Sequence, residues 1–276
     1  MTELANDSVW RRRMDQIENR VQDIRLPTMN SHGLDLDQDE EWCEVVVENE
    51  KHRIRFHDYD RVFEIPGLYE ELFYNKLKCC SPSYVVNLLE DVAEEQRVDP
   101  CNLKVLDVGA GNGMVGDELR HHGVKKIVGV DILEEAKEAA QRDRPRVYKD
   151  YRVADLTELP KHDEEAIKKH GLNCLTTVAA LGYGDIPPAA FLKALELIAT
   201  PAWLAFNIKE DFLREQDGSG FSRLIQRLIN EGYIQPQCYR RYRHRLSIAG
   251  EPLYYIAMIA RKLRAVPASL LAAQSN

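Results

Sequence analysis

The sequence contains no run of about 18 apolar residues, the length that a membrane-spanning helix requires. Its first stretch, MTELANDSVWRRRMDQ, lacks the apolar centre of a secretion signal. None of the six cysteines belongs to a CxxC pair, so neither a zinc ribbon nor a disulfide framework is expected. These absences predict a cytoplasmic protein with reduced thiols, no metal ion and no membrane partner.

A surplus of positive charge is also missing. The chain has 45 acidic and 37 basic residues, a net charge of −8, which argues against nucleic acid as a partner. One basic stretch, residues 240–245 (RRYRHR), interleaves arginine and tyrosine in a way that could suit RNA. The same alternation is typical of a strand whose alternate side chains are solvated, and we favour that interpretation. With 44% hydrophobic residues the 276-residue chain can build one large domain plus an extension.

Residues 1–78 are predicted to form an N-terminal extension, or cap, made of a helix, a β-hairpin and a second helix. Apolar residues recur at helical spacing over residues 8–25, and residues 68–77 favour another helix. Residues 42–47 and 52–57 favour the two strands of the hairpin. His52 and His57 would point to opposite faces of the second strand, so they are not expected to share a metal ion.

From residue 104 onward, short apolar strands alternate with helical segments. The predicted strands are residues 104–108, 126–130, 150–153, 174–178 and 203–208. Such alternation indicates a Rossmann-like α/β domain with a parallel sheet covered on both faces. Two late strands, residues 237–243 and 253–260, are joined by too few residues for a crossover, so they should pair antiparallel. We place this domain at residues 79–264 and a C-terminal tail at residues 265–276.

The most informative motif is VLDVGAGNG at residues 105–113, a buried strand that breaks into a glycine-rich turn before a helix. Gly109, Gly111 and Gly113 allow positive φ angles and close approach of a ligand to the backbone. The helix that follows supplies unpaired N–H groups, and open α/β sheets bind ligands at the carboxyl ends of their strands. The motif therefore predicts a ligand site at this turn.

Two ligand classes use glycine turns of this kind. Gly111, Gly113 and Gly116 literally match the GxGxxG fingerprint of nicotinamide and flavin dinucleotides. However, Gly109 already follows the strand. If the fingerprint is counted from Gly109, its third glycine position falls on Met114, so the fingerprint is broken. Asp107, inside the strand, would also suit a cationic ligand better than a pyrophosphate. A nicotinamide or flavin dinucleotide remains the alternative to a cationic ligand.

Two further acids follow neighbouring strands of the predicted sheet. Asp131 comes directly after residues 126–130, where a carboxylate can accept hydrogen bonds from both hydroxyls of a ribose. Asp155 follows residues 150–153, where it can bind the amino group of an adenine while Leu156 covers the ring. The three strand ends together predict a nucleoside-binding site.

These motifs together resemble class I S-adenosylmethionine (SAM)-dependent methyltransferases over about residues 80–262. VLDVGAGNG is similar to the family's first motif, GVDI (residues 129–132) to its second-strand acid, and VADL (residues 153–156) to its adenine-contacting segment. The resemblance implies a seven-stranded sheet whose last strand is antiparallel, and SAM as cofactor. The cofactor-binding residues it implies are Asp107, Gly109, Ala110, Gly111, Asn112, Gly113, Asp131, Ile132, Asp155, Leu156 and Ala180.

The methyl acceptor is read less directly from the sequence. The segment AALGYGDIP (residues 179–187) is not the motif of amino-methylating DNA enzymes, so nucleobase N-methylation is discounted. By analogy with small-molecule methyltransferases, Tyr59 and Tyr69 of the cap and Tyr183 after the fourth strand would contact the substrate; Asp185 and Asn207 are nearby candidates. The leading hypothesis is a small-molecule methyl acceptor, with no catalytic residue assigned. Two alternative functions remain: a protein or RNA methyltransferase, and a non-catalytic SAM-binding protein. The oligomeric state also remains open, with a homodimer as one alternative.

Overall fold

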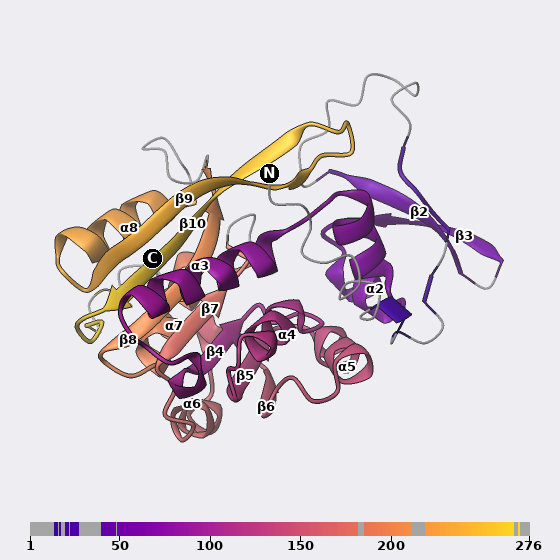
Figure 1. Cartoon of the computed structure of the whole chain (residues 1–276). Coiled ribbons are helices and arrows are strands. Elements are labelled where there is room, and N and C mark those ends of the chain that lie inside the picture. Colours follow the sequence, from indigo (N-terminus) through magenta and orange to yellow (C-terminus); the bar gives the residue numbers. More distant parts are fainter. Residues whose placement is uncertain are drawn as a thin grey trace.

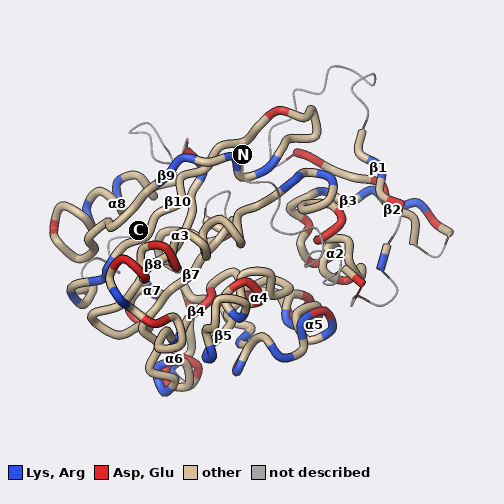
Figure 2. The backbone as a smooth tube through the Cα atoms, viewed as in Figure 1, with Lys and Arg blue, Asp and Glu red and all other residues tan. Residues whose placement is uncertain are grey.

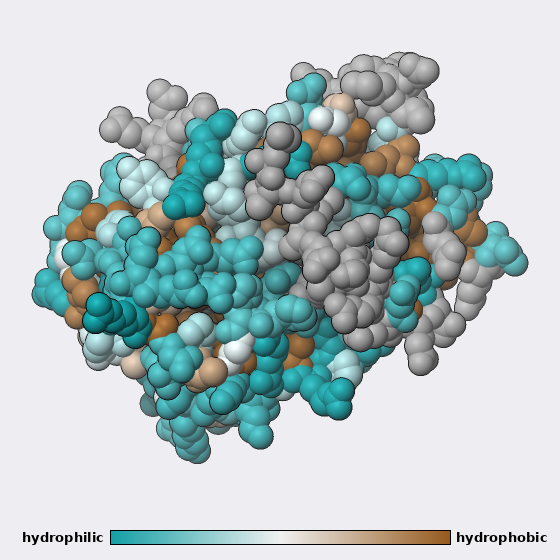
Figure 3. Space-filling view, in the orientation of Figure 1, coloured by the Kyte–Doolittle hydropathy of each residue, from teal (hydrophilic) through white to brown (hydrophobic). Residues whose placement is uncertain are grey.

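The computed structural model of the chain describes residues 14–15, 17, 20–21, 23–27, 40–47, 49–181, 185–210, 219–267 and 270. Over these residues a seven-stranded sheet carries helices on both faces, and a three-stranded sheet lies to one side of it (Figure 1). The face seen in Figure 3 is mostly hydrophilic, with its apolar residues in small groups. Among the described residues, no helix combines the length and the hydropathy needed to cross a membrane.

The large sheet has the strand order β6-β5-β4-β7-β8-β10-β9. Its five parallel strands are β4 (Lys104–Val108), β5 (Lys126–Asp131), β6 (Asp150–Val153), β7 (Cys174–Thr177) and β8 (Ala202–Lys209). The long strand β10 (Pro252–Lys262) lies between β8 and β9 (Ile234–Leu246) and runs antiparallel to both. The predicted Rossmann-like sheet and its antiparallel final pairing are confirmed.

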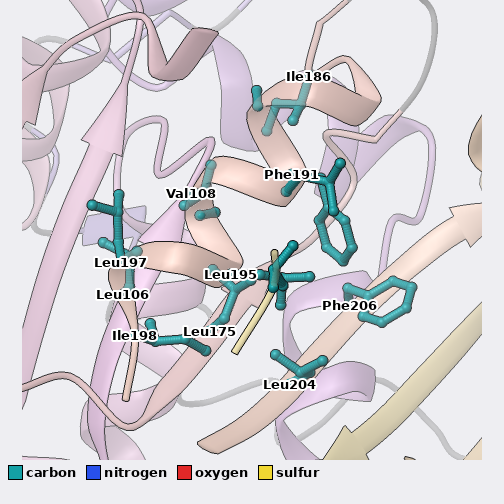
Figure 4. Close-up of a cluster of buried hydrophobic side chains, with 14 of the residues drawn as sticks. Leu106, Val108, Leu175, Ile186, Phe191, Leu195, Leu197, Ile198, Leu204 and Phe206 are labelled. Atoms are coloured by element: carbon teal, nitrogen blue, oxygen red, sulfur yellow. The ribbon is translucent and has the colours of Figure 1, made fainter. Parts of the chain in front are cut away.

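Helices cover both faces because alternate residues of each buried strand point to opposite sides. Val105 and Ile127 pack with α3 (Ser81–Glu95) and α4 (Met114–His121). Leu106 and Val128 pack in the cluster formed with α6 (Lys161–Lys168), α7 (Pro188–Leu197) and α8 (Phe221–Asn230). Figure 4 shows Leu106 on this second side with Phe191 of α7. The same domain also contains α5 (Glu134–Asp143) and two short 3₁₀ turns, η2 (Pro100–Asn102) and η3 (Leu156–Glu158).

The N-terminal region forms a second, smaller core. Strands β1 (Ile24–Arg25), β2 (Trp42–Val47) and β3 (Glu50–Arg55) make an antiparallel sheet, followed by α2 (Tyr59–Glu64) and the π-helix η1 (Glu70–Lys76). Phe56, Leu68 and Leu72 are fully buried in this core. The predicted hairpin and the predicted helix near residues 68–77 are therefore present, whereas the short helix α2 was not predicted.

Two predictions for this region need correction. Most of the helix predicted over residues 8–25 lies outside the described residues, but its last part is wrong: Ile24 and Arg25 pair with β2 as a strand. The hairpin also turns earlier than predicted, because Asn49 adopts a left-handed conformation with φ of 67° and the second strand begins at Glu50. His57 therefore lies beyond β3, so the strand geometry invoked for it does not apply.

Candidate functional site

A pocket of about 460 Å³ opens at the carboxyl ends of the parallel strands. Gly109 and Gly111 follow β4, Asp131 ends β5, Leu156 follows β6, and Ala180 follows β7, and all five line the pocket. The chain leaves β4 for β5 on one side, whereas β7 pairs with β4 on the other. The pocket thus occupies the topological switch point, where loops on the two sides of the sheet diverge and leave a crevice.

The glycine turn holds the loops close together. Gly109 has φ of 68°, and a Cβ added to it would lie 2.8 Å from the Cβ of Ala180. Gly111 has φ of 51°, and its N–H donates to Oδ2 of Asp131 at 2.9 Å. Both residues need the left-handed conformation that glycine adopts without strain. The turn therefore presents bare backbone to the pocket and fixes the neighbouring carboxylate.

Asp131 is held by two backbone bonds. In addition to the bond from Gly111, its Oδ1 accepts the N–H of Leu133 at 3.1 Å. Burial raises the pKa of this carboxyl above its usual value, and the backbone N–H groups of Gly111 and Leu133, with a smaller contribution from that of Ile132, act in the opposite direction. Because each carboxylate oxygen can accept more than one hydrogen bond, Asp131 retains capacity for a ligand hydroxyl pair at the pocket wall.

The part of the pocket that follows β6 combines polar and apolar side chains. Asp155 lines it, and its Oδ1 accepts both the N–H and the hydroxyl of Thr157 at 2.7 Å, so the residue also caps η3. Leu156 forms a buried wall. Ile132 lines the same pocket and is 58% exposed, an unusual state for a large aliphatic side chain. These residues offer apolar surface to a flat ligand group.

Several predicted residues support the pocket from behind and do not line it. Asp107 is buried beneath the glycine turn, where its carboxylate accepts hydroxyl bonds from Tyr148 and Thr176, each at 2.7 Å. Burial raises the pKa of Asp107 to about 6. Asn112 points its side-chain amide toward the cap. Ala110 and Gly113 complete the turn, and Gly113 forms the N-cap of α4.

The cap covers the pocket with aromatic rings. Tyr59, Phe63 and Tyr69 all line it, and their rings follow one another at centroid distances of 6.0 and 5.2 Å. A Cβ added to Gly111 would lie 3.1 Å from Cζ of Phe63, so the Phe63 ring rests on the glycine turn. Tyr59 and Tyr69 line the pocket, and their contact with a substrate stays a prediction; Phe63 was missed, and Tyr183 lies outside the described residues. The aromatic content of residues 56–74 was the signal available for Phe63.

A buried ion pair fastens the cap to the glycine turn. The guanidinium of Arg144 donates to Oε1 of Glu70 at 2.8 Å, with side-chain exposures of only 6% and 1%. Asn112 donates to the same oxygen at 2.7 Å, and its own carbonyl accepts from Arg144 at 3.1 Å. The guanidinium of Arg142 adds bonds to the backbone oxygen of Phe63. Since a buried charge without its partner is costly, this triad holds the cap over the pocket.

A second space of about 30 Å³, here called the inner compartment, adjoins the pocket. His57, Tyr59, Tyr69 and Asp185 line both spaces. Nδ1 of His57 lies 3.9 Å from Oδ2 of Asp185, and burial, with a smaller contribution from Asp131, raises the pKa of Asp185 to about 6. The imidazole of His57, from the cap, therefore meets the carboxyl of Asp185, from the core, where the two spaces join.

Other residues that line the inner compartment come from the segment before α3 and from strands β9 and β10. These residues include Cys79, His244, Arg245 and Tyr255. Arg245 is buried and donates to Glu41, which is also buried, so its charge is balanced. None of these residues was predicted as a site residue, because their approach depends on how the cap meets β9 and β10.

Residues 105–177 match the family model for the methyltransferase domain. The chain carries a SAM-dependent methyltransferase domain. The matched segment of this methyltransferase spans β4 to β7, and it includes the glycine turn, Asp131 and Asp155. The predicted enzyme class and cofactor are confirmed. No curated protein matches the chain in sequence.

Solved structures similar to this methyltransferase include the magnesium protoporphyrin IX methyltransferase of Synechocystis PCC 6803 with bound SAM. It is 14% identical, with 66% of this chain and 79% of that chain covered and a TM-score of 0.45. A putative RNA methyltransferase from Pyrococcus horikoshii is 15% identical over 66% and 84%, with a TM-score of 0.47. A ribosomal protein L11 methylase from Lactobacillus delbrueckii subsp. bulgaricus is 16% identical over 66% and 79%, with a TM-score of 0.43. Likeness at this level carries no argument about the methyl acceptor.

Proposed function

We propose that the pocket binds SAM in a defined orientation. Asp131 accepts the two ribose hydroxyls, Gly109 and Gly111 lie against the methionine and ribose, and Ile132 and Leu156 flank the adenine. Three features support this arrangement: an acid able to accept further hydrogen bonds, bare glycine backbone beside it, and an exposed isoleucine and a buried leucine that line the same pocket. Asp155 at that end supplies an acceptor for the adenine amino group.

The acidic character of the site fits a cation. Asp131 and Asp185 both line the pocket, and Asp107 lies beneath its floor. Burial raises the pKa of all three carboxyls, and a positive charge bound beside them would lower it again, because it stabilises the ionised form. SAM supplies an activated methyl group on a positively charged sulfur, which a site of this charge favours over a pyrophosphate.

We further propose that the methyl acceptor is a small molecule that enters the inner compartment. The observation that carries this proposal is the small volume of about 30 Å³ that joins the cofactor pocket between the cap and strands β9 and β10. Such a volume admits a group of a few heavy atoms, held close to the methyl donor with water excluded. His57 and Asp185 at the junction are the groups able to take a proton from that acceptor.

The surface supports a small-molecule methyl acceptor more than nucleic acid. Figure 2 shows basic and acidic residues interspersed along the chain. The basic stretch forms part of β9, as the solvated-strand interpretation predicted: Arg240, Arg241 and Arg243 are exposed. Arg241 bonds Glu210 at 2.9 Å and covers the ring of Tyr254. This stretch does not form a concentrated positive face.

Two experiments test the proposal. Calorimetric titration with SAM, S-adenosylhomocysteine and NADH should show binding of the first two only, and binding of NADH alone would overturn the cofactor assignment. Incubation of the full chain with methyl-labelled SAM and a cell extract, followed by ultrafiltration, should place the label in the low-molecular-weight fraction. Label retained with protein or RNA would favour a macromolecular methyl acceptor, and no transfer at all would favour a non-catalytic SAM-binding protein.

A further inference from the structure

Four buried polar side chains form a continuous network behind the inner compartment. Ser81 begins α3, Asn207 belongs to β8, and Tyr242 and His244 belong to β9. Their relative exposures lie between 0% and 6%, so each polar atom depends on protein partners. The hydroxyl of Ser81 lies 2.6 Å from both the Tyr242 hydroxyl and Nδ1 of His244. This network plays no part in the cofactor site described above.

The direction of every hydrogen bond in the network follows from one backbone group. The N–H of Ala179 can only donate, and it lies 2.6 Å from Oδ1 of Asn207. The other end of that amide, Nδ2, must therefore donate, and it reaches the Tyr242 hydroxyl at 2.6 Å and Oγ of Ser81 at 3.2 Å. The Tyr242 hydrogen is then directed to Ser81, and the Ser81 hydrogen to Nδ1 of His244.

This chain of bonds determines the tautomer of His244. Because Nδ1 accepts, the proton of a neutral imidazole resides on Nε2. Burial, and to a lesser extent Arg245, lowers the pKa of His244 well below 6.5, so the ring is neutral at physiological pH. The ring also packs on Tyr255 at a centroid distance of 4.1 Å, which holds its plane. The hydrogen bonds that the described residues form with this imidazole all involve Nδ1.

We propose that the inner compartment is a recognition site in which His244 presents a fixed Nε2–H donor to the methyl acceptor. The proposal rests on the proposed function, because the ligand is the substrate of the methyltransferase. A fixed donor selects a ligand that offers a lone pair there: a carbonyl, a carboxylate or an aromatic ring nitrogen. Glu41 balances the charge of Arg245, so Arg245 adds no net positive charge to this selection.

The tautomer is testable without knowing the methyl acceptor. Long-range ¹H–¹⁵N spectra of the full chain with ¹⁵N-labelled histidine distinguish a proton on Nε2 from one on Nδ1, and loss of signals in His244→Gln assigns the ring. The native protein should show Nε2–H. In Asn207→Asp, studied at alkaline pH so that the buried carboxyl is ionised, the new carboxylate can only accept, so Tyr242 turns toward it, Ser81 loses its free hydrogen, and His244 must donate from Nδ1. Tyr242→Phe is the matched control that keeps Nε2–H, because Asn207 and Ser81 still bond in the original direction.

An Nδ1–H proton in the native protein, or an unchanged tautomer in a folded Asn207→Asp protein, would overturn the proposal. If Asn207→Asp does not fold, Ser81→Ala replaces it. That variant removes the hydroxyl that donates to Nδ1, so a mixture of tautomers is expected, and a pure Nε2–H signal would show that the network does not set the tautomer.

Two small probes test the donor itself. Acetamide, which offers a carbonyl lone pair, should shift the His244 Nε2 signal, whereas tetramethylammonium, which has none, should not. A shift by both or by neither would contradict a donor directed into the compartment. Spectra recorded with and without S-adenosylhomocysteine separate the two proposals: cofactor binding with no acetamide shift refutes only the recognition site. With a methyl acceptor in hand, His244→Phe should raise KM about 3- to 10-fold and leave SAM affinity unchanged.

Discussion

Replacing Asp131 with alanine tests the cofactor assignment most directly. The carboxylate already accepts the N–H groups of Gly111 and Leu133, and in the proposed complex it also accepts two ribose hydroxyls. A hydrogen bond to a charged group contributes about 1.5–3 kcal/mol, so two such bonds set an upper limit of about 6 kcal/mol. In the variant, the N–H groups of Gly111 and Leu133 can form some replacement hydrogen bonds with the ribose or with water. The expected loss of binding free energy is therefore roughly 2–4 kcal/mol.

That loss corresponds to SAM binding that is about 30- to 1,000-fold weaker. Isothermal titration with S-adenosylhomocysteine, which is not consumed, measures it in the Asp131→Ala protein. Glu138→Ala is the matched control, because it removes the same charge from an exposed position on α5, and its affinity should stay within about twofold of native. Urea unfolding of the unliganded variant should show a loss of about 1–2 kcal/mol from the two N–H groups. An Asp131→Ala protein that is folded and binds within a few-fold of native would refute the ribose assignment.

Three further predictions follow from the buried charges. Glu70→Ala leaves Arg144 buried without its partner, so urea unfolding should show a free energy of unfolding about 3–5 kcal/mol lower than that of the native protein. A loss below about 1 kcal/mol would mean that the ion pair does not hold the cap. Because the pKa of Asp107 is raised from 3.8 to about 6, its contribution to folding is present below pH 3.8 and lost as the pH rises through 6. Asp107→Asn should therefore lessen the fall in unfolding free energy between about pH 4 and pH 7, and identical slopes in both proteins would contradict this. A bound cation favours ionised carboxylates, so the affinity for SAM should fall below about pH 6 more steeply than the affinity for S-adenosylhomocysteine. Titrations with both ligands at about pH 5 and pH 7.5 measure the two changes in affinity. Equal changes for both ligands would exclude coupling of the SAM charge to Asp107 and Asp185.

The sheet and the glycine turn were predictable because their signals are local. Strands β4 and β6 have the predicted bounds, since a short apolar run between a loop and a turn marks a buried parallel strand. Gly109, Gly111, Asp131 and Asp155 meet in one pocket because the carboxyl ends of parallel strands share an edge of the sheet. Their roles toward a bound ligand stay predictions.

The contacts between the cap and the core, and the inner compartment, were not predictable, because they join distant parts of the chain. Glu70 and Arg144 are separated by 74 residues, and Ser81 and His244 by 163, with no local pattern that pairs them. Asp107 shows a different limit: its position in the strand was read correctly, but only the folded packing of Tyr148 and Thr176 reveals that its carboxylate is enclosed. The hairpin shows a further limit: Asn49 adopts a left-handed conformation, the second strand begins at Glu50, and His57 lies beyond its end.

The wall of the inner compartment comes from outside the segment that identifies the family. Among the described residues that line it, none lies within residues 105–177; they come from residues 57–79, 179–185 and 244–255. Substitutions at His244, Arg245 or Tyr255, which do not line the cofactor pocket, would change the shape and polarity of this space without altering the glycine turn or Asp131. If the inner compartment holds the methyl acceptor as proposed, similarity confined to residues 105–177 does not identify the substrate.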